Sequence, residues 1–135
     1  MVVLNIKYTG QKNCELVHQP SGALLLTDAP KDNQGKGESF SPTDLLAASL
    51  ISCMITTMAI KAEPQGFDLK GCFGKVIKEM SSDPRKVRQL TTEIHLPKNL
   101  TAEQKTFLEN IAHGCPVKLS LHPEVITSTT FIYDL

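Results

Sequence analysis

Several common features are missing from this chain of 135 residues, and each absence argues against a class of protein. The 14 basic and 14 acidic side chains cancel, so no net positive charge attracts nucleic acids or anionic membranes. The longest uncharged stretch, residues 45–60, is shorter than the roughly 20 apolar residues of a membrane helix. No basic segment leads into an apolar signal core. We therefore expect neither a nucleic-acid partner nor a membrane partner.

The cysteine pattern lacks the spacings of a metal site. The four cysteines form no C-x-x-C pair, and the only close histidine–cysteine pair is His113 with Cys115. We therefore expect no metal. A chain of this length needs no disulfide to be stable, so free thiols in a reducing, cytoplasmic compartment are expected. Cys14 and Cys72 fall in strand-like segments, where they are interpreted as structural or incidental thiols.

The chain also lacks internal repeats and low-complexity linkers, and its composition of 41% apolar and 21% charged residues is typical of one globular domain spanning 1–135. Apolar periodicity and turn residues predict strands, helices and their order. Strands are expected over residues 2–9, 14–19, 22–29, 69–80, 86–96 and 125–133, with helices over 45–60, after Thr101, and from Pro116. The order βββ-α-ββ-α-α-β predicts an α+β fold with helices on antiparallel sheet.

The longest expected helix has a clear beginning. Ser41 can cap it, Pro42 suits the first helical position, and the Asp44 carboxylate can accept a hydrogen bond from the Ser41 N–H. Residues 45–60 are apolar on nearly all sides, which indicates burial in a core or between subunits. A second capping box, from Thr101 to Gln104, announces the next helix.

Two cysteines lie in distinctive surroundings. At about 100° per residue, Cys53 falls on the only polar stripe of its helix, within an arc of roughly 140°. The stripe consists of Ser49, Ser52, Cys53, Thr56 and Thr57. Close helix packing and a thiol site both explain it. Cys115 precedes a proline at an expected helix start, where free N–H groups lower a thiol pKa. Cys53 lies too far along its helix for this effect, so a thiolate there requires a nearby cation.

The segment from Ser41 to Met54, taken with the distant Cys115-Pro116-Val117, resembles the OsmC/Ohr family of osmotically inducible and organic hydroperoxide resistance proteins. The likeness is closest to the uncharacterised OsmC-like branch. It implies an intertwined homodimer with antiparallel sheets wrapped around central helices. It also implies that Cys53 is the peroxidatic thiol and Cys115 the resolving thiol. An organic hydroperoxide would be the substrate, a dithiol such as dihydrolipoamide the reductant, and no cofactor is needed.

The chain departs from the peroxidase branches of this family at two positions. Those branches carry an arginine in the N-terminal strands, whereas the arginines here are Arg85 and Arg88; Lys12, Lys31 or Lys36 could supply a point charge. The glutamate that pairs with that arginine aligns with Thr43, followed by Asp44. Candidate supporting residues are Ser49, Thr56, Thr57, Thr43 and Asp44. A redox-sensing or small-ligand-binding module stays open as an alternative, and thiol–disulfide exchange with protein partners ranks lower.

Overall fold

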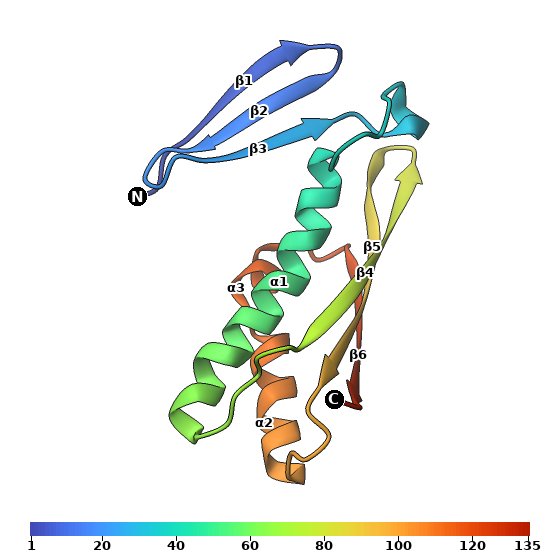
Figure 1. The fold of residues 1–135 in the computed structure, drawn as a ribbon. Helices are drawn as coiled ribbons and strands as arrows, with labels where there is room; N and C mark the ends of the chain where they lie inside the picture. Colours follow the sequence, from blue (N-terminus) through green and yellow to red (C-terminus); the bar gives the residue numbers. More distant parts are fainter. The chain divides into compact units, whose positions relative to one another are not determined.

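The computed structural model describes all 135 residues and consists of two compact units, residues 1–46 and 47–135. The predicted element order is confirmed (Figure 1). The strands are β1 (Leu4–Gly10), β2 (Asn13–His18), β3 (Ala23–Asp28), β4 (Phe73–Ser82), β5 (Arg85–Leu96) and β6 (Ile126–Tyr133). The helices are α1 (Pro42–Ala62), α2 (Ala102–His113) and α3 (Pro116–Ser120), with short 3-10 turns at Lys31–Asn33 and Glu63–Gln65. That residues 1–135 together form a single domain stays a prediction.

The N-terminal unit is an antiparallel meander in the order β1-β2-β3, as the turn residues predict. Its β1–β2 turn takes left-handed backbone at Gln11 and Lys12, with φ of 53° and 65°. Alternation along β1 puts Leu4, Ile6 and Tyr8 on one face of the sheet. Their exposed fractions are 56%, 60% and 64%, so this apolar face is uncovered in the single chain.

The predicted beginning of α1 is confirmed in detail. The Ser41 N–H donates to Asp44 Oδ2 at 2.8 Å, and the Asp44 N–H donates to Ser41 Oγ at 3.1 Å. These bonds satisfy backbone donors that a helix leaves free at its first turn. The helix continues two residues past the predicted end, to Ala62, because Lys61 and Ala62 are good helix formers. Gly66, with a φ of 82°, then turns the chain away.

The C-terminal unit contains a second sheet in the order β4-β5-β6. β4 and β5 are antiparallel, whereas β5 and β6 are parallel. The expectation of purely antiparallel sheet is therefore wrong for β6. Between β5 and β6 the chain passes through α2 and α3, and such a helical crossover returns it in its original direction. Figure 1 shows the helices of this unit beside one face of the sheet.

The core of the C-terminal unit lies between α1, α2 and β5. Leu90, Ile94 and Leu96 of β5 are fully buried, as are Met54 and Met58 of α1. The remaining buried apolar members are Ala47, Leu50, Ile51, Ala62, Leu69, Val87, Leu108, Ala112 and Cys115. This core accounts for the apolar residues on one side of α1. Leu46 and Ile60, on the side away from the core, stay exposed in the single chain.

Three local details concern the C-terminal sheet, and the first differs from the predicted start of its strand. β4 begins at Phe73 rather than at residue 69, because Gly71 adopts a φ of 89° in a turn. In β5, Glu79 pairs with Gln89 and Met80 with Val87, so the register shifts there and Val87 points inward. A third detail is the close approach of β4 to α1. A Cβ on Gly74 would overlap the backbone oxygen of Glu93 and lie 2.6 Å from Ile51 Cδ1, and the backbone contact leaves room only for glycine.

The helical segment Pro42–Gln65 is long and apolar enough to span a membrane, with 24 residues and a mean hydropathy of 1.8. The core helix of a soluble protein meets the same criteria. In the single chain 33% of the segment's most apolar stretch is buried, and these buried residues belong to the core just described.

His95 predicts how stability depends on pH. Its Nδ1 lies 2.9 Å from Asp134 Oδ1, its Nε2 lies 3.1 Å from Glu93 Oε1, and its ring stacks on Phe73. Hydrogen bonds to Asp134 and then Glu93 raise the pKa of His95. Glu93 also pairs with Lys75. A raised pKa stabilises the fold below the unfolded value of about 6.5, and this contribution is lost as pH rises through the folded value.

The measurement is the urea midpoint of unfolding between pH 6 and pH 9. The wild type should lose more stability over this range than His95→Gln does. His122→Gln, at an exposed histidine, is the control and should keep the slope of the wild type. Parallel profiles for wild type and His95→Gln would show that the imidazolium contacts contribute nothing.

Candidate functional site

Cys53 lies near the middle of α1, half-buried at the edge of the core. Its Sγ is 3.8 Å from the Oγ1 of Thr57, within hydrogen-bond distance for sulfur. Residues four apart stack on one face of a helix, which is why these two side chains meet. The thiol is thus partly accessible and has a hydroxyl group one turn further along.

Cys115 lies at the corner between α2 and α3, where the sequence predicts a helix start. It is the N-cap residue of α3, and its Sγ accepts a hydrogen bond from the Lys118 N–H at 3.4 Å. Pro116 occupies the first helical position, as expected. The Cys115 side chain is fully buried. The sulfur is therefore fixed by backbone donors inside the core rather than at the surface.

The two thiols are neighbours, although 62 residues separate them in the sequence. The side chain of Cys53 lies close enough to that of Cys115 to raise the pKa of the Cys115 thiol. Both groups belong to the C-terminal unit. The structure therefore joins the two cysteines that the resemblance pairs, and each is a free thiol.

The pKa of Cys115 is raised, whereas its place before a helix predicts a lowered value. Burial raises it most, and the backbone N–H groups of Lys118 and Val117 oppose this only in part. The neighbouring Cys53 raises the pKa further. The expectation of a lowered pKa is therefore wrong. The sequence correctly predicts the helix start, whose N–H groups lower the pKa, but it does not show that the sulfur is buried away from water, which raises the pKa more.

The immediate partners of the two sulfurs are neutral. Within the C-terminal unit they are the Thr57 hydroxyl, the backbone N–H groups of Lys118 and Val117, and each other. The Lys118 ammonium is directed to another partner, His113 Nδ1, at 3.1 Å. The lysine nearest in sequence to Cys115 thus contributes its backbone N–H to the sulfur, while its charged end bonds to an imidazole.

The remaining stripe residues of α1 are distributed along its surface. Ser52 is exposed and donates to the Ser49 carbonyl at 3.2 Å. Thr56 is exposed and lines a surface hollow at the C-terminal end of α1, with Ile60 and Phe67. Among the predicted supporting residues the structure places Thr57 against Cys53. The supporting roles of Ser49 and Thr56 stay predictions.

Thr43 and Asp44 belong to the N-terminal unit, where they take part in the beginning of α1. Asp44 makes the reciprocal bonds with Ser41, and the Ser41 and Thr43 hydroxyl oxygens lie 3.2 Å apart. These contacts give both residues a local capping role. A role in cysteine activation stays a prediction.

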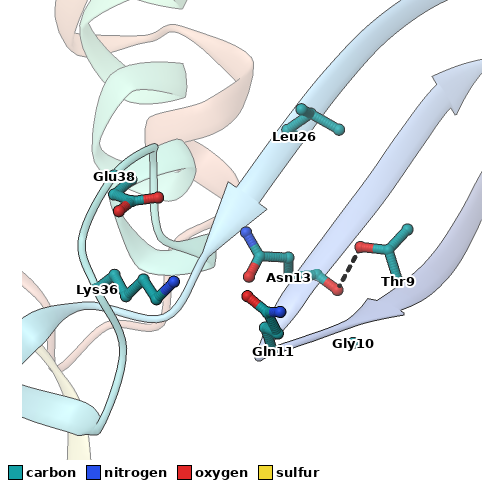
Figure 2. A pocket seen from close by; sticks show the side chains of 7 residues that line it. All are labelled: Thr9, Gly10, Gln11, Asn13, Leu26, Lys36 and Glu38. Atoms are coloured by element: carbon teal, nitrogen blue, oxygen red, sulfur yellow. Dashed lines mark hydrogen bonds between the residues drawn. The ribbon is translucent and has the colours of Figure 1, made fainter.

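Figure 2 shows a pocket of the N-terminal unit beside the β1–β2 turn. Its lining comprises Thr9, Gly10, Gln11, Asn13, Leu26, Lys36 and Glu38. Lys36 is exposed at this pocket, whereas Lys12 donates its ammonium to the Gln34 carbonyl at 2.7 Å. All three lysines considered as cation sources, Lys12, Lys31 and Lys36, thus belong to the N-terminal unit.

The chemistry available to the thiol site is that of a dithiol. One sulfur is half-exposed and can meet a small molecule, and the second is buried in contact with it. Such a pair can be oxidised to a disulfide and reduced again without a metal ion or an organic cofactor. No group of three or more His, Cys, Asp or Glu side chains in the structure could hold a metal ion.

This combination of α+β fold and paired thiols agrees with the comparisons to known proteins. The family described as OsmC-like protein matches residues 35–130. A crystal structure from Psychrobacter arcticus 273-4 shares 40% identity over 97% of this chain and 96% of that chain, with a TM-score of 0.92. Its description assigns it only provisionally to the osmotic stress induced and detoxification response proteins. No curated protein matches.

More distant structures share the fold. An organic hydroperoxide resistance protein OsmC from Legionella pneumophila is 19% identical, with a TM-score of 0.73 and coverage of 98% of this chain and 96% of that chain. The organic hydroperoxide resistance protein OhrB of Bacillus subtilis is 18% identical, with a TM-score of 0.68 and 97% coverage of both chains. The chain belongs to the OsmC-like protein family.

The burial of Cys115 predicts slow chemical labelling of this thiol. At pH 8, iodoacetamide should alkylate Cys115 in the folded, reduced protein at least tenfold more slowly than in the urea-unfolded chain. The reasons are a raised thiol pKa and a sulfur without solvent exposure. Mass spectrometry of peptides, sampled over time, measures the rate for each cysteine separately. Equal rates in the folded and unfolded chains would contradict the buried thiol.

Proposed function

We propose that this protein reduces organic hydroperoxides with its two neighbouring thiols, Cys53 and Cys115. The contact between a half-exposed and a fully buried thiol carries the proposal. Membership of the OsmC-like family supports it, as do the distant structures described as organic hydroperoxide resistance proteins. A reducing compartment, for which we propose the cytoplasm, suits a cycle that begins and ends with free thiols.

The first step uses the accessible sulfur. The Cys53 thiolate attacks the terminal oxygen of the hydroperoxide R–O–OH, and the O–O bond breaks. The sulfur becomes a sulfenic acid, Cys53–S–OH, and the leaving alkoxide takes a proton to become the alcohol ROH. The thiol is oxidised by two electrons and the hydroperoxide is reduced by two, so the step is balanced.

The second step uses the buried sulfur. Cys115 attacks the Cys53 sulfenic acid, which forms the disulfide and releases one water. Burial is the largest cause of the raised pKa of Cys115, and it favours the protonated form of this thiol. This preference keeps Cys53 as the attacking thiol and holds Cys115 in reserve until the sulfenic acid has formed.

The third step restores both thiols. A dithiol such as dihydrolipoamide attacks the disulfide, becomes an intramolecular disulfide itself, and leaves Cys53 and Cys115 protonated. A dithiol suits this step because its second sulfur closes on the first and completes the exchange. The half-exposed Cys53 is the sulfur that an incoming thiol can reach.

A redox-sensing or ligand-binding module without efficient turnover is the second candidate. The neutral surroundings of the two sulfurs favour it, because thiolate formation at neutral pH is usually promoted by a cation. The reductase and a redox sensor both require oxidation of Cys53, whereas a ligand-binding module does not. The candidates differ in turnover, since only the reductase consumes many equivalents of hydroperoxide when dithiol is in excess.

We further propose that the protein is a homodimer, as the family resemblance implies. The uncovered apolar face of β1, with Leu4, Ile6 and Tyr8, supports this assembly. Exposed apolar patches of this kind mark protein interfaces. The exposed side of α1 at Leu46 and Ile60 points the same way.

Substitutions at the cysteines test the proposed reaction. With dihydrolipoamide in excess, Cys53→Ser should lower cumene hydroperoxide consumption at least a hundredfold. Cys115→Ser should turn over at least tenfold more slowly than the wild type and accumulate overoxidised Cys53, because only the external dithiol, and no neighbouring thiol, can then trap the sulfenic acid. Cys72→Ser, at a thiol outside the pair, is the control and should keep the activity of the wild type. A Cys53→Ser protein as active as the wild type would refute the reductase.

A second variant tests the homodimer. Light scattering should give twice the chain mass of 14.8 kDa for the wild type. Ile6→Lys should shift the mass toward the monomer, because it places a charge within the apolar face. Lys7→Gln, on the opposite face of the same strand, should stay dimeric. A monomeric wild type would contradict the proposed assembly.

A further inference from the structure

The geometry around Cys53 raises the question of how its thiolate is stabilised. The partners of the two sulfurs in the C-terminal unit are neutral, and the ammonium of Lys118 bonds to His113 instead. A thiolate needs hydrogen-bond donors or positive charge. The structure provides candidate hydrogen-bond donors at two points, one on α1 and one at the corner between α2 and α3.

The first donor is the hydroxyl of Thr57, whose Oγ1 lies 3.8 Å from Cys53 Sγ. Either atom can donate in this contact. With a protonated thiol, the S–H can donate to the hydroxyl oxygen. Once the sulfur is ionised it can only accept, so the hydroxyl must turn its proton toward it. A hydrogen bond to an ionised acceptor is roughly twice as strong as a neutral one, so this contact favours the thiolate.

The second candidate donor is the thiol of Cys115, which neighbours Cys53 and whose pKa Cys53 raises. Burial keeps this thiol protonated and therefore able to donate. Its sulfur in turn accepts from the N–H groups of Lys118 and Val117, at the beginning of α3. These backbone dipoles pull electron density from the Cys115 sulfur, which makes its S–H a better donor.

From these contacts we infer that Thr57 is a further catalytic residue, whose hydroxyl stabilises the Cys53 thiolate together with the Cys115 S–H. The inference deepens the proposed function, on which it rests, because it concerns the same reacting sulfur. It assigns to Thr57 a direct contact with the reacting atom. The neighbouring Thr56, which is exposed and lines the hollow at the end of α1, is not part of this inference.

The expected size of the effect follows from the contact. Hydrogen bonds to charged groups commonly change an equilibrium tenfold or more, and a long contact to sulfur lies at the lower end. Removing the Thr57 hydroxyl should therefore move the midpoint of Cys53 ionisation upward by about 0.5–1 pH unit. At pH 7 this lowers the alkylation rate of Cys53 three- to tenfold.

The test compares three variants of the full-length reduced protein. Thr57→Val removes the hydroxyl and keeps the shape, Thr57→Ser keeps the hydroxyl, and Thr56→Val makes the same change one residue away. Iodoacetamide labelling of Cys53 is followed by peptide mass spectrometry from pH 5 to pH 11. We expect Thr57→Val to raise the midpoint, with a plateau rate at high pH equal to or above that of the wild type. Thr57→Ser and Thr56→Val should keep the midpoint of the wild type.

The plateau separates stabilisation of the thiolate from a change in access. A less stabilised thiolate is at least as nucleophilic once formed, so its plateau does not fall. An unchanged midpoint in Thr57→Val would overturn the inference, and so would a fallen plateau with the midpoint unmoved. An equal shift in Thr56→Val would also overturn it, since the effect would then belong to the helix and not to the hydroxyl.

Failure of the inference can be told from failure of the proposed function. Labelling by iodoacetamide needs no hydroperoxide and no reductant, so it reports on the thiolate alone. A shifted midpoint in a protein that does not consume hydroperoxide would support the role of Thr57 and refute the reductase. An unshifted midpoint in a protein with full turnover would do the reverse.

Discussion

The contact between the Cys53 and Cys115 sulfurs is the interaction on which the account of this protein depends. It joins the middle of a core helix to a corner 62 residues further along the chain. A sulfenic acid on one sulfur alone would depend on an external thiol for its reduction, whereas a neighbouring sulfur can trap it within the chain. Together the two sulfurs give the chain a two-electron oxidation that leaves its backbone unchanged.

The fold maintains this contact by burying one side of α1 against the sheet. Met54, next to Cys53 in sequence, is fully buried, and this fixes the rotation of the helix that leaves Cys53 at the core boundary. The parallel crossover from β5 through α2 and α3 to β6 brings the Cys115 corner to the same core. Precise packing of a well-filled core holds such positions within narrow limits.

Local sequence signals predict the beginnings of helices well, because capping depends on a few neighbouring residues. Ser41, Asp44 and Thr101 act as the pattern indicates. The parallel pairing of β6 and the register shift near Val87 depend on contacts between distant segments, and no local pattern carries them. The buried state of Cys115 is of the same kind. The sequence shows that Cys115 precedes Pro116 at a helix start. The apolar surroundings that raise its pKa form only when the core assembles.

The most direct test of the paired thiols is the mass of the protein after brief exposure to one equivalent of cumene hydroperoxide. If the two sulfurs react in sequence, the chain loses two hydrogens, and digestion yields one disulfide-linked species containing the Cys53 and Cys115 peptides. A gain of oxygen on Cys53, with Cys115 still a free thiol and no loss of two hydrogens, would contradict the account.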